Sequence, residues 1–365
     1  MRRTLVILTI QTLVIVAAVV LSIPAGSATL AQDDTSPSTF ARLDGVTIYF
    51  TEESREATPF DRSPQGLSRF AGLLSALGAD IKSLDWRADI PEDADLVVIA
   101  APTRDIEDYQ SARLWAYLNN GGALLIMADP ILYSEEDGVT ITEMNSRALR
   151  RDRGLFLLTW AGYGLRARED VVVTEVGDGQ LDRDLMTGEL NTNHPILQGV
   201  TGPLAIFSAR SLEVDASIQA YDAQPLVYSG AEYYGETLYV DYLQLNTEDF
   251  TPGTDTARGR LPLAAASENS MTGARIVLIG DGGIAMNGEG FRSAPSNSAG
   301  FVFPANVQFM MNTIAWLVGA DSAETETFVF PTPGPTATAT PIVVATPTPE
   351  PTPIDEAESA DEASG

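Results

Sequence analysis

The sequence of 365 residues has no cysteine, a single histidine and a single lysine. The absence of cysteine excludes disulfide bonds, thiolate metal sites, iron–sulfur clusters and cysteine nucleophiles. One histidine offers little for a metal site or a general base, because each usually needs a second group to orient the ring. Neither a Gly-x-Ser-x-Gly elbow nor a GxxxxGK phosphate loop is present. We therefore expect a protein that is not an enzyme and that needs no cofactor or metal.

Basic residues are also scarce: 22 Lys and Arg stand against 50 Asp and Glu, a formal net charge of −28. This charge repels phosphate backbones, so we expect no nucleic acid as a partner. The hydrophobic share of 44% is nevertheless sufficient for a sizeable core. The length fits one large domain once segments at both ends that do not fold are removed.

The N-terminal segment, residues 1–31, is typical of an export signal. Arg2 and Arg3 precede an apolar run over 5–21, and the chain then breaks at Pro24 into small residues. Cleavage after residue 28 or 31 and an uncleaved anchor in the cytoplasmic membrane are both compatible with this pattern. In each case the following chain lies outside the cytoplasm, either secreted or anchored by this segment.

The C-terminal segment, residues 331–365, has the composition of a disordered tail. It contains eight Pro, seven Thr and six acidic residues, with no Lys or Arg. It cannot bury enough apolar surface to fold, and its repeated Thr-Pro pairs favour an extended polyproline II conformation. A stalk or tether and an inert solubilising tail are both consistent with this composition.

Between these ends, about residues 40–325, apolar strands alternate with amphipathic helices. A parallel strand covered on both faces is a continuous apolar run, and four runs have this form: 46–50, 95–101, 123–128 and 275–280. Helices are predicted from Ser63-Pro64 to Gly78, with Ser63 as N-cap, over 106–120 and over 306–318. The alternation predicts an α/β fold with a doubly wound, mostly parallel sheet.

The middle of the chain is less regular. We predict a helix over 146–161 and a strand over 171–176, followed by a β-rich insertion over about 177–260. Its members are expected at 204–207, 226–229 and 237–243, and regular structure returns with a strand over 261–266. The last predicted helix presents one apolar face to the sheet, formed by Val307, Met310, Met311, Ile314 and Leu317.

Several segments resemble a known family in its order. They include DADLVVIAAPTRDIEDYQSARLWAYLNNGGALLIMADP, GYGLRAREDVVV, NHPILQG, RGRLPLAAASE and RIVLIGDGGIAMN. Together they look like the DUF4350 family and the related auxiliary domain of gliding-motility-type ABC transporters, over most of residues 46–319. The resemblance implies a three-layer sandwich similar to flavodoxin and class I glutamine amidotransferases, and a non-catalytic domain that is exported or membrane-associated.

Two departures from this family affect what the resemblance implies. Many relatives read Gly-Asp-Ser-Asp-Phe where this chain has Gly280-Asp281-Gly282-Gly283-Ile284, without the second acid. Relatives also often continue into a transmembrane helix where this chain has its Pro/Thr-rich tail. The first departure argues against a role for paired acids at this turn. The second argues against direct attachment to a permease.

Candidate binding residues follow the predicted strands, because ligands of open parallel sheets bind beyond the carboxyl ends of the strands. The strand ends supply Thr51, Glu52, Thr103, Arg104, Asp129, Asp281 and Asn287. The expected start of the first helix adds Ser63, Gln65 and Gly66, whose free N–H groups favour an anion. The plainer interpretations are that Ser63 only caps its helix and that Asp281 only holds a turn. We interpret His194 as a turn residue before Pro195, and the acids 178–189 as a solvated loop without calcium-loop spacing.

Three functional hypotheses remain. The first is a non-catalytic extracytoplasmic domain that binds an unidentified small ligand, or a membrane transporter or envelope protein, at the strand ends. The second is a structural surface protein with the Thr-Pro tail as its stalk. The third is a carboxylate-dependent hydrolase built on Asp129 or Asp281 with Glu52, for which the sequence provides no nucleophile.

Overall fold

The computed structural model describes residues 38–130, 153–177, 179–244, 258–295, 300–320 and 325–328. The predicted export signal (1–31) and the predicted tail (331–365) lie outside the described residues, as does the first half of the helix predicted over 146–161. Within the described ranges, no helix combines the length and the apolar character needed to cross a bilayer.

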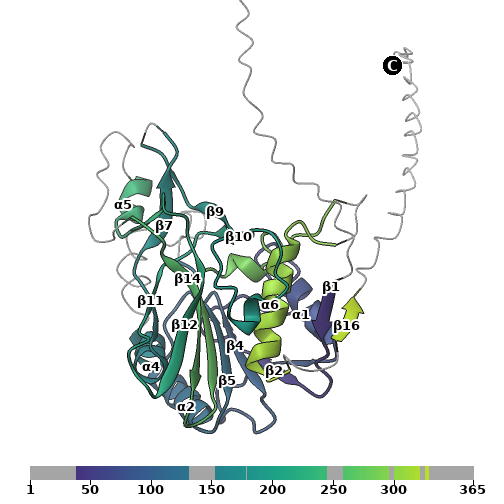
Figure 1. The fold of residues 1–365 in the computed structure, drawn as a ribbon. Coiled ribbons are helices and arrows are strands. Elements are labelled where there is room, and N and C mark those ends of the chain that lie inside the picture. The colour runs from purple at the N-terminus through teal and green to yellow at the C-terminus, as the bar shows by residue number, and fades with distance from the viewer. Residues whose placement is uncertain are drawn as a thin grey trace, which may run out of the picture.

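A seven-stranded sheet forms the centre of the molecule (Figure 1). Its order is β12 (Tyr221–Tyr228), β14 (Pro262–Asn269), β15 (Arg275–Ile279), β5 (Ala123–Met127), β4 (Leu96–Ala100), β2 (Thr47–Phe50) and β3 (Asp80–Ser83). The pairs from β15 to β3 are parallel, and the pairs β15–β14 and β14–β12 are antiparallel. A mixed α/β fold with a mostly parallel central sheet is therefore confirmed.

Helices cover both faces of this sheet. On one face lie α1 (Ser68–Ala76) and α6 (Pro304–Leu317), and on the other α2 (Asp108–Asn119) and α4 (Arg153–Tyr163). Successive strand residues alternate between the two cores: Ile48 and Phe50 contribute to the first and Tyr49 to the second. Burial on both faces explains why these strands are continuous apolar runs.

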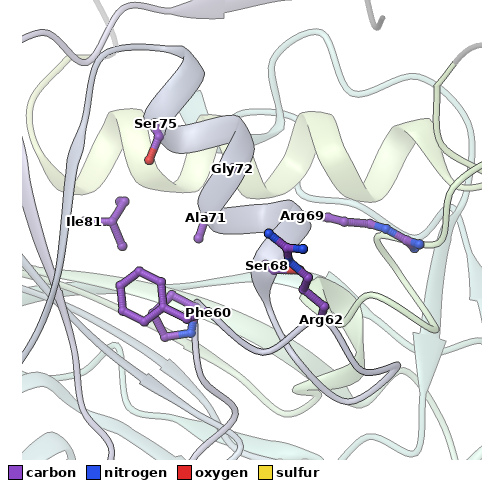
Figure 2. Close-up of a pocket in the computed structure, with 9 residues that line it drawn as sticks. Phe60, Arg62, Ser68, Arg69, Ala71, Gly72, Ser75 and Ile81 are labelled. Atoms are coloured by element: carbon purple, nitrogen blue, oxygen red, sulfur yellow. The ribbon is translucent and has the colours of Figure 1, made fainter. Parts of the chain in front are cut away.

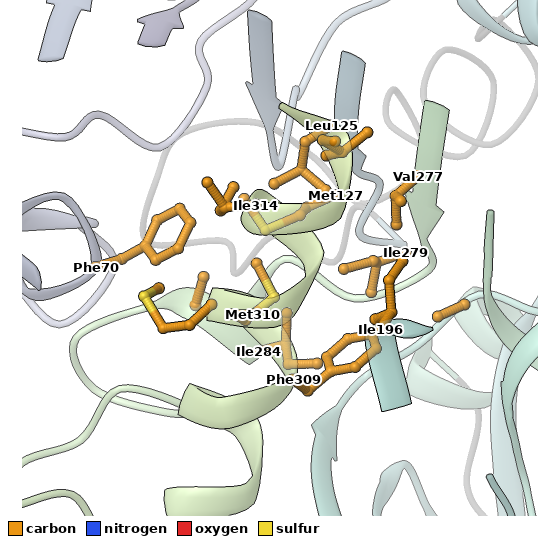
Figure 3. Packing of buried hydrophobic residues seen from close by; sticks show 14 of the residues in the cluster. Phe70, Leu125, Met127, Ile196, Val277, Ile279, Ile284, Phe309, Met310 and Ile314 are labelled. Carbon is orange, nitrogen blue, oxygen red and sulfur yellow. The ribbon is translucent and has the colours of Figure 1, made fainter. Parts of the chain in front are cut away.

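Helix α6 is the main cover of the first face (Figure 3). Its Phe309, Met310 and Ile314 pack toward Met127 of β5 and Ile279 of β15. The predicted apolar face of this helix is confirmed, because all five of its members are at most 4% exposed.

Two predicted elements are wrong. The first helix begins at Ser68, not at Ser63-Pro64. Ser63 instead donates its N–H and its hydroxyl to the Asp61 carboxylate, both at 2.7 Å, and the carbonyl of Pro64 accepts from Gly288. The preceding residues are thus held in turns rather than in the helix.

The strand predicted over 237–243 is helix α5 (Tyr239–Gln244). The N–H of Leu238 donates to the Glu236 carboxylate at 2.7 Å, as at a helix start. Tyr239 and Tyr242 are three residues apart, so they share one helix face and pack together beside β7. This pairing of rings requires the helical period of 3.6 rather than the strand period of 2.

The β-rich part contains three small sheets. They pair β9 (Asp184–Thr187) with β10 (Leu204–Phe207), β6 (Leu165–Ala167) with β11 (Leu212–Val214), and β7 (Val171–Glu175) with β8 (Leu181–Asp182) and β13 (Tyr234–Glu236). The strand predicted at 226–229 instead belongs to β12 of the central sheet. A further pair joins β1 (Ser38–Ala41) to β16 (Thr325–Phe328), on the side of the molecule where α1 and α6 lie (Figure 1).

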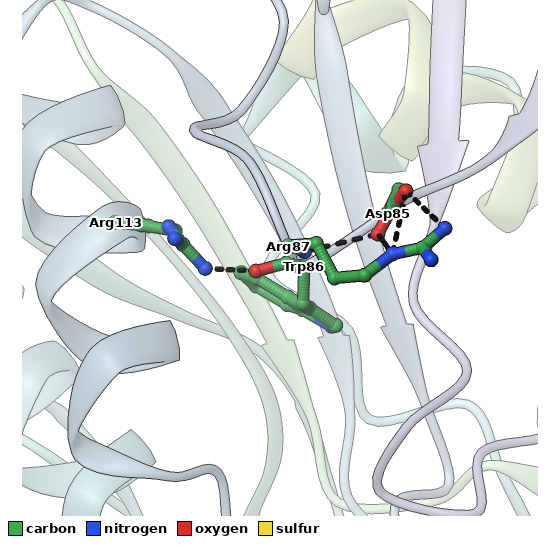
Figure 4. Close-up of polar contacts among 4 residues, drawn as sticks. All are labelled: Asp85, Trp86, Arg87 and Arg113. Carbon is green, nitrogen blue, oxygen red and sulfur yellow. Dashed lines mark hydrogen bonds and ion pairs between the residues drawn. The ribbon is translucent and has the colours of Figure 1, made fainter.

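The loop after β3 is fixed to the second face by polar contacts (Figure 4). Arg113 of α2 donates to the carbonyl of Trp86, whose side chain is 1% exposed. Next to it, Arg87 binds the Asp85 carboxylate at 2.8 Å. The Arg113 contact joins this loop to α2, whereas the pair of Arg87 and Asp85 lies within the loop itself.

Candidate functional site

The structure brings two of the predicted site residues together. Asp129 follows β5 and Asp281 follows β15, and these strands are parallel neighbours. Asp129 accepts a hydrogen bond from the N–H of Gly282, and a Cβ on Gly282 would lie 3.0 Å from Oδ2 of Asp129. Oδ2 of Asp281 accepts from the N–H of Phe207 at 2.9 Å. The two carboxyl groups therefore flank one turn and hold neighbouring backbone in place.

A third acid, Glu289, completes this cluster. A Cβ on Gly283 would collide with the Glu289 carboxylate and would lie 3.0 Å from Oδ1 of Asp281, so the two acids face each other across a position that only glycine fits. Oδ1 of Asp281 is buried and has no hydrogen-bond partner among the described residues. The sequence signal for Glu289 is weak, since it is one acid in a Gly-rich loop.

The acids of this cluster hold protons more tightly than usual. Burial raises the pKa of Asp281 well above its ordinary value, and the neighbouring Asp129 charge adds to the effect. Burial likewise raises the pKa of Asp129 to about 7 and the pKa of Glu289 in the same direction. Across the described residues, no group of three or more acidic or histidine side chains has the arrangement of a metal site.

The segment after β10 covers these strand ends. The N–H of Arg210 donates to the carbonyl of Gly280 at 2.7 Å, and the Arg210 side chain is 1% exposed. Its guanidinium lies 5.2 Å from the ring centroid of Phe156 and donates to the carbonyl of Arg168 at 2.6 Å. The segment after β10 therefore packs against the end of β15, at the edge of the sheet where a crevice is expected.

The other predicted residues lie apart from the acid cluster. Glu52 is exposed and accepts a hydrogen bond from Ser83 at 2.5 Å, and Arg104 is exposed. Thr51 is buried and donates at 2.7 Å to Glu56, a buried acid that the sequence analysis missed. Burial raises the pKa of Glu56. The hydroxyl of Thr103 is buried and has no hydrogen-bond partner within the described ranges.

Asn287 joins the expected anion-binding segment to the rest of the fold, in a structural role. Its Nδ2 donates to the carbonyls of Asp61 at 3.0 Å and Ser63 at 2.8 Å, and its Oδ1 accepts from the N–H of Arg69 at 2.9 Å. Asn287 thereby caps α1 from a distant part of the chain. The backbone N–H of Gly66 donates to the carbonyl of Ser63, and Gln65 faces solvent, so the expected free helix N-terminus at these residues is wrong.

A small polar pocket of 210 Å³ surrounds His194, away from the strand ends. Its lining residues are Asn193, His194, Pro195, Asp222, Gln224, Glu268 and Trp316. Nδ1 of His194 accepts from the N–H of Ile196 at 3.3 Å, which places the proton of the neutral ring on Nε2. The ring packs edge-on against Trp316 at 5.1 Å, and burial lowers its pKa. His194 therefore lies in a turn, as expected, and also lines a pocket.

A larger groove of 590 Å³ runs along the outer side of α1 (Figure 2). Its lining residues are Pro59, Phe60, Arg62, Ser68, Arg69, Ala71, Gly72, Ser75 and Ile81. Phe60 and Ile81 lie at one end and the two arginines at the other. No local pattern in the sequence indicates this surface, because its members come from a loop, a helix and an edge strand.

Residues 46–313 match the family described as "ABC-type uncharacterized transport system". The chain belongs to this family. The predicted kinship with an ABC-transporter auxiliary domain is therefore confirmed. No curated protein matches this chain.

Solved structures similar to the chain have low sequence identity. The "mmIFT52 N-terminal domain" is 15% identical with a TM-score of 0.49, over 74% of this chain and 97% of that one. A "putative thua-like protein" from Bacteroides uniformis is 11% identical with a TM-score of 0.38, over 77% and 94%. A "cytoplasmic protein" from Salmonella typhimurium is 12% identical with a TM-score of 0.38, over 74% and 98%.

Proposed function

We propose that this chain is a non-catalytic binding domain that works outside the cytoplasm as an auxiliary part of an ABC-type transport system. Family membership over residues 46–313 is the observation that carries the link to transport. The Arg pair and apolar run at residues 2–21 support a location outside the cytoplasm.

The acids at the strand ends have a structural role, which supports a non-catalytic domain. Asp129 and Asp281 accept hydrogen bonds from backbone N–H groups of the covering turns, so both side chains act in holding the fold. The N–H of Arg210 donates to the carbonyl of Gly280, so the segment after β10 packs on the chain next to Asp281. A carboxylate-dependent hydrolase built on Asp281 would need this acid exposed to a substrate, but Asp281 is fully buried.

We assign the binding site to the pocket at His194. It presents the Nε2–H donor of His194, the amides of Asn193 and Gln224 and the carboxylates of Asp222 and Glu268. Such mixed donors and acceptors suit a small polar ligand or a polar side chain of a partner.

The parallel strands run β3, β2, β4, β5, β15, which is second, first, third, fourth and fifth in chain order. This order supports a flavodoxin-like or amidotransferase-like sandwich as the finer fold assignment.

The experiment uses the absence of native cysteine, which makes a single introduced thiol a unique attachment point. Gln224→Cys at the pocket rim and Met271→Cys, at a site 85% exposed, would each carry a photoactivatable crosslinker in the full chain in native membranes. We expect Gln224→Cys to crosslink to a membrane subunit of an ABC transporter and Met271→Cys not to. Failure of Gln224→Cys to crosslink such a subunit, or equal crosslinking from both positions, would contradict the proposal.

Small-ligand binding is tested with the same pocket. Because His194 is the only histidine, its ring gives one set of imidazole resonances. Titration with sugars, nucleotides, peptides and divalent ions should shift that set for the true class of ligand, and Asp222→Asn should weaken the response. If no probe shifts the His194 resonances, the pocket does not bind these small ligands. The crosslinking experiment then tests whether the pocket binds a protein partner.

A further inference from the structure

The outer edge of the central sheet is open at β3. In a parallel ladder, alternate residues point their backbone groups to opposite sides. Asp80 and Leu84 donate toward β2, so the N–H and C=O groups of Ile81 and Ser83 point away from the sheet. These outward groups have no hydrogen-bond partner within the described part of the chain. An uncovered edge of this kind is a template for another strand.

The 590 Å³ groove along α1, which is apolar at one end only, lies directly beside this edge. Ile81 belongs to both, because its side chain packs toward the α1 face of the sheet and lines the 590 Å³ groove. The small residues Ala71, Gly72 and Ser75 leave space along α1, and Phe60 is 63% exposed (Figure 2). A strand added to β3 would place alternate side chains over this groove.

The charge of the groove is opposite to that of the chain. No acidic residue is among the described residues that line it, although the protein has a net charge of −28. Arg62 forms no hydrogen bond or ion pair with any described residue, and the guanidinium of Arg69 donates to the backbone carbonyls of Asn287 and Phe291. The groove therefore complements a segment that is apolar at one end and acidic at the other.

The chain itself contains such a segment. Residues 342–345, Ile-Val-Val-Ala, form the β-branched cluster of the Pro/Thr-rich tail, between Pro341 and Pro347. All six acids of the tail follow it, the first being Glu350. We propose that residues 342–346 add to the outer edge of β3 as a parallel strand, with the acidic end of the tail at Arg62 and Arg69.

The direction follows from the fold. α1 and β3 are joined by the short turn at 77–79 and pack together, so they run in opposite directions. The arginines at the start of α1 consequently lie toward the carboxyl end of β3. A parallel strand ends on that same side, and the six residue steps from Val344 to Glu350 span about 19 Å in an extended conformation. This exceeds the length of about 10 Å between residues 68 and 75 of α1.

The tail is long enough to reach this edge. β16 ends at Phe328, beside β1 on the α1 side of the molecule (Figure 1). The intervening residues 329–341 span up to about 40 Å when extended. A tether of this length gives an effective concentration on the order of millimolar, so even a weak contact becomes populated.

The test measures amide hydrogen exchange at Ile81 and Ser83 in the full chain. Docking should protect both amides. The double substitution V343P/V344P removes two backbone donors of the docking segment and should raise both exchange rates by about tenfold or more. The matched control Ala339→Pro, which places proline outside the segment, should leave them unchanged. Equal rates in wild type and in V343P/V344P would overturn the proposal.

A second pair of variants tests docking by changing the groove instead of the tail. A Cβ on Gly72 meets no atom within 4 Å, so a larger side chain there fills the groove without disturbing α1. Gly72→Leu should expose the amides of Ile81 and Ser83 as V343P/V344P does, whereas Gly72→Ala should retain protection. Protection that persists in Gly72→Leu would place the tail elsewhere. Protection that grows with protein concentration would assign the strand to a second copy and overturn the intramolecular form.

Discussion

At the scale of single residues, the side chain of Asn287 connects the loop after β15 to the start of α1. It bonds to the carbonyls of Asp61 and Ser63, to the hydroxyl of Ser68 and to the N–H of Arg69. It is 3% exposed, so its loss would leave several buried polar groups unpaired. We expect Asn287→Ala to lower the free energy of unfolding by about 2–4 kcal/mol, measured from the urea midpoint.

A second asparagine provides the control for this prediction. Asn312 on α6 also donates to two carbonyls, those of Ile196 at 2.9 Å and Gln198 at 2.8 Å, but at a partly exposed site. Water can replace its partners, so Asn312→Ala should cost about 1 kcal/mol. If both variants lost the same stability, the proposed role of Asn287 as a distant cap of α1 would be wrong.

At the scale of elements, the sequence predicts the strands that are buried on both faces. It does not predict features that depend on contacts between distant parts of the chain. The strands β4, β5 and β15 are apolar runs because both of their faces are covered, and their bounds agree with the prediction within one residue. The edge strand β3, with the sequence DIKS, has no such run and was not predicted. Ser63 has the chemistry of a cap, but the actual cap of α1, Asn287, comes from a loop after β15 that no local pattern indicates.

Helix α1 also allows a stabilising change. Gly72 lies in its middle, and a Cβ there would enter open space at a backbone conformation that any residue adopts. Gly72→Ala should therefore raise the free energy of unfolding by about 0.5–1 kcal/mol, through lower entropy of the unfolded chain. Thermal unfolding of the two proteins measures the difference. Gly290→Ala is the opposite control, because its Cβ would collide with the carbonyl of Ile284 and should destabilise.

At the scale of the whole molecule, the sequence predicts the location of Asp129 and Asp281 but not their surroundings. Parallel strands end at one edge, so acids after β5 and β15 are expected to meet there. The residues that cover them, Phe207 and Arg210, come from an irregular connection whose path is set by tertiary contacts. For the same reason the pocket at His194 could not be predicted, since its walls come from η2 (Pro195–Leu197), β12, β14 and α6.

The acids at the strand ends should also set the pH dependence of stability. Asp281, Asp129 and Glu289 have raised pKa values in the folded state, so the native protein binds more protons than the unfolded chain above pH 4. Stability from these groups is complete below their unfolded pKa values and is lost as pH rises toward and past about 7, the pKa of Asp129. Each additional bound proton contributes a slope of up to about 1.4 kcal/mol per pH unit.

Urea unfolding between pH 6.5 and pH 8 isolates this effect. The pKa of His194 is lowered from 6.5, so its contribution has the opposite sign and is confined to lower pH. We expect the wild-type protein to lose stability across this range. Asp281→Asn mimics the protonated acid and still accepts the N–H of Phe207, so it should flatten the slope. Glu52→Gln, at an exposed acid outside the cluster, should keep the wild-type slope. Parallel pH profiles for all three proteins would show that the acids at the strand ends titrate alike in the folded and unfolded states.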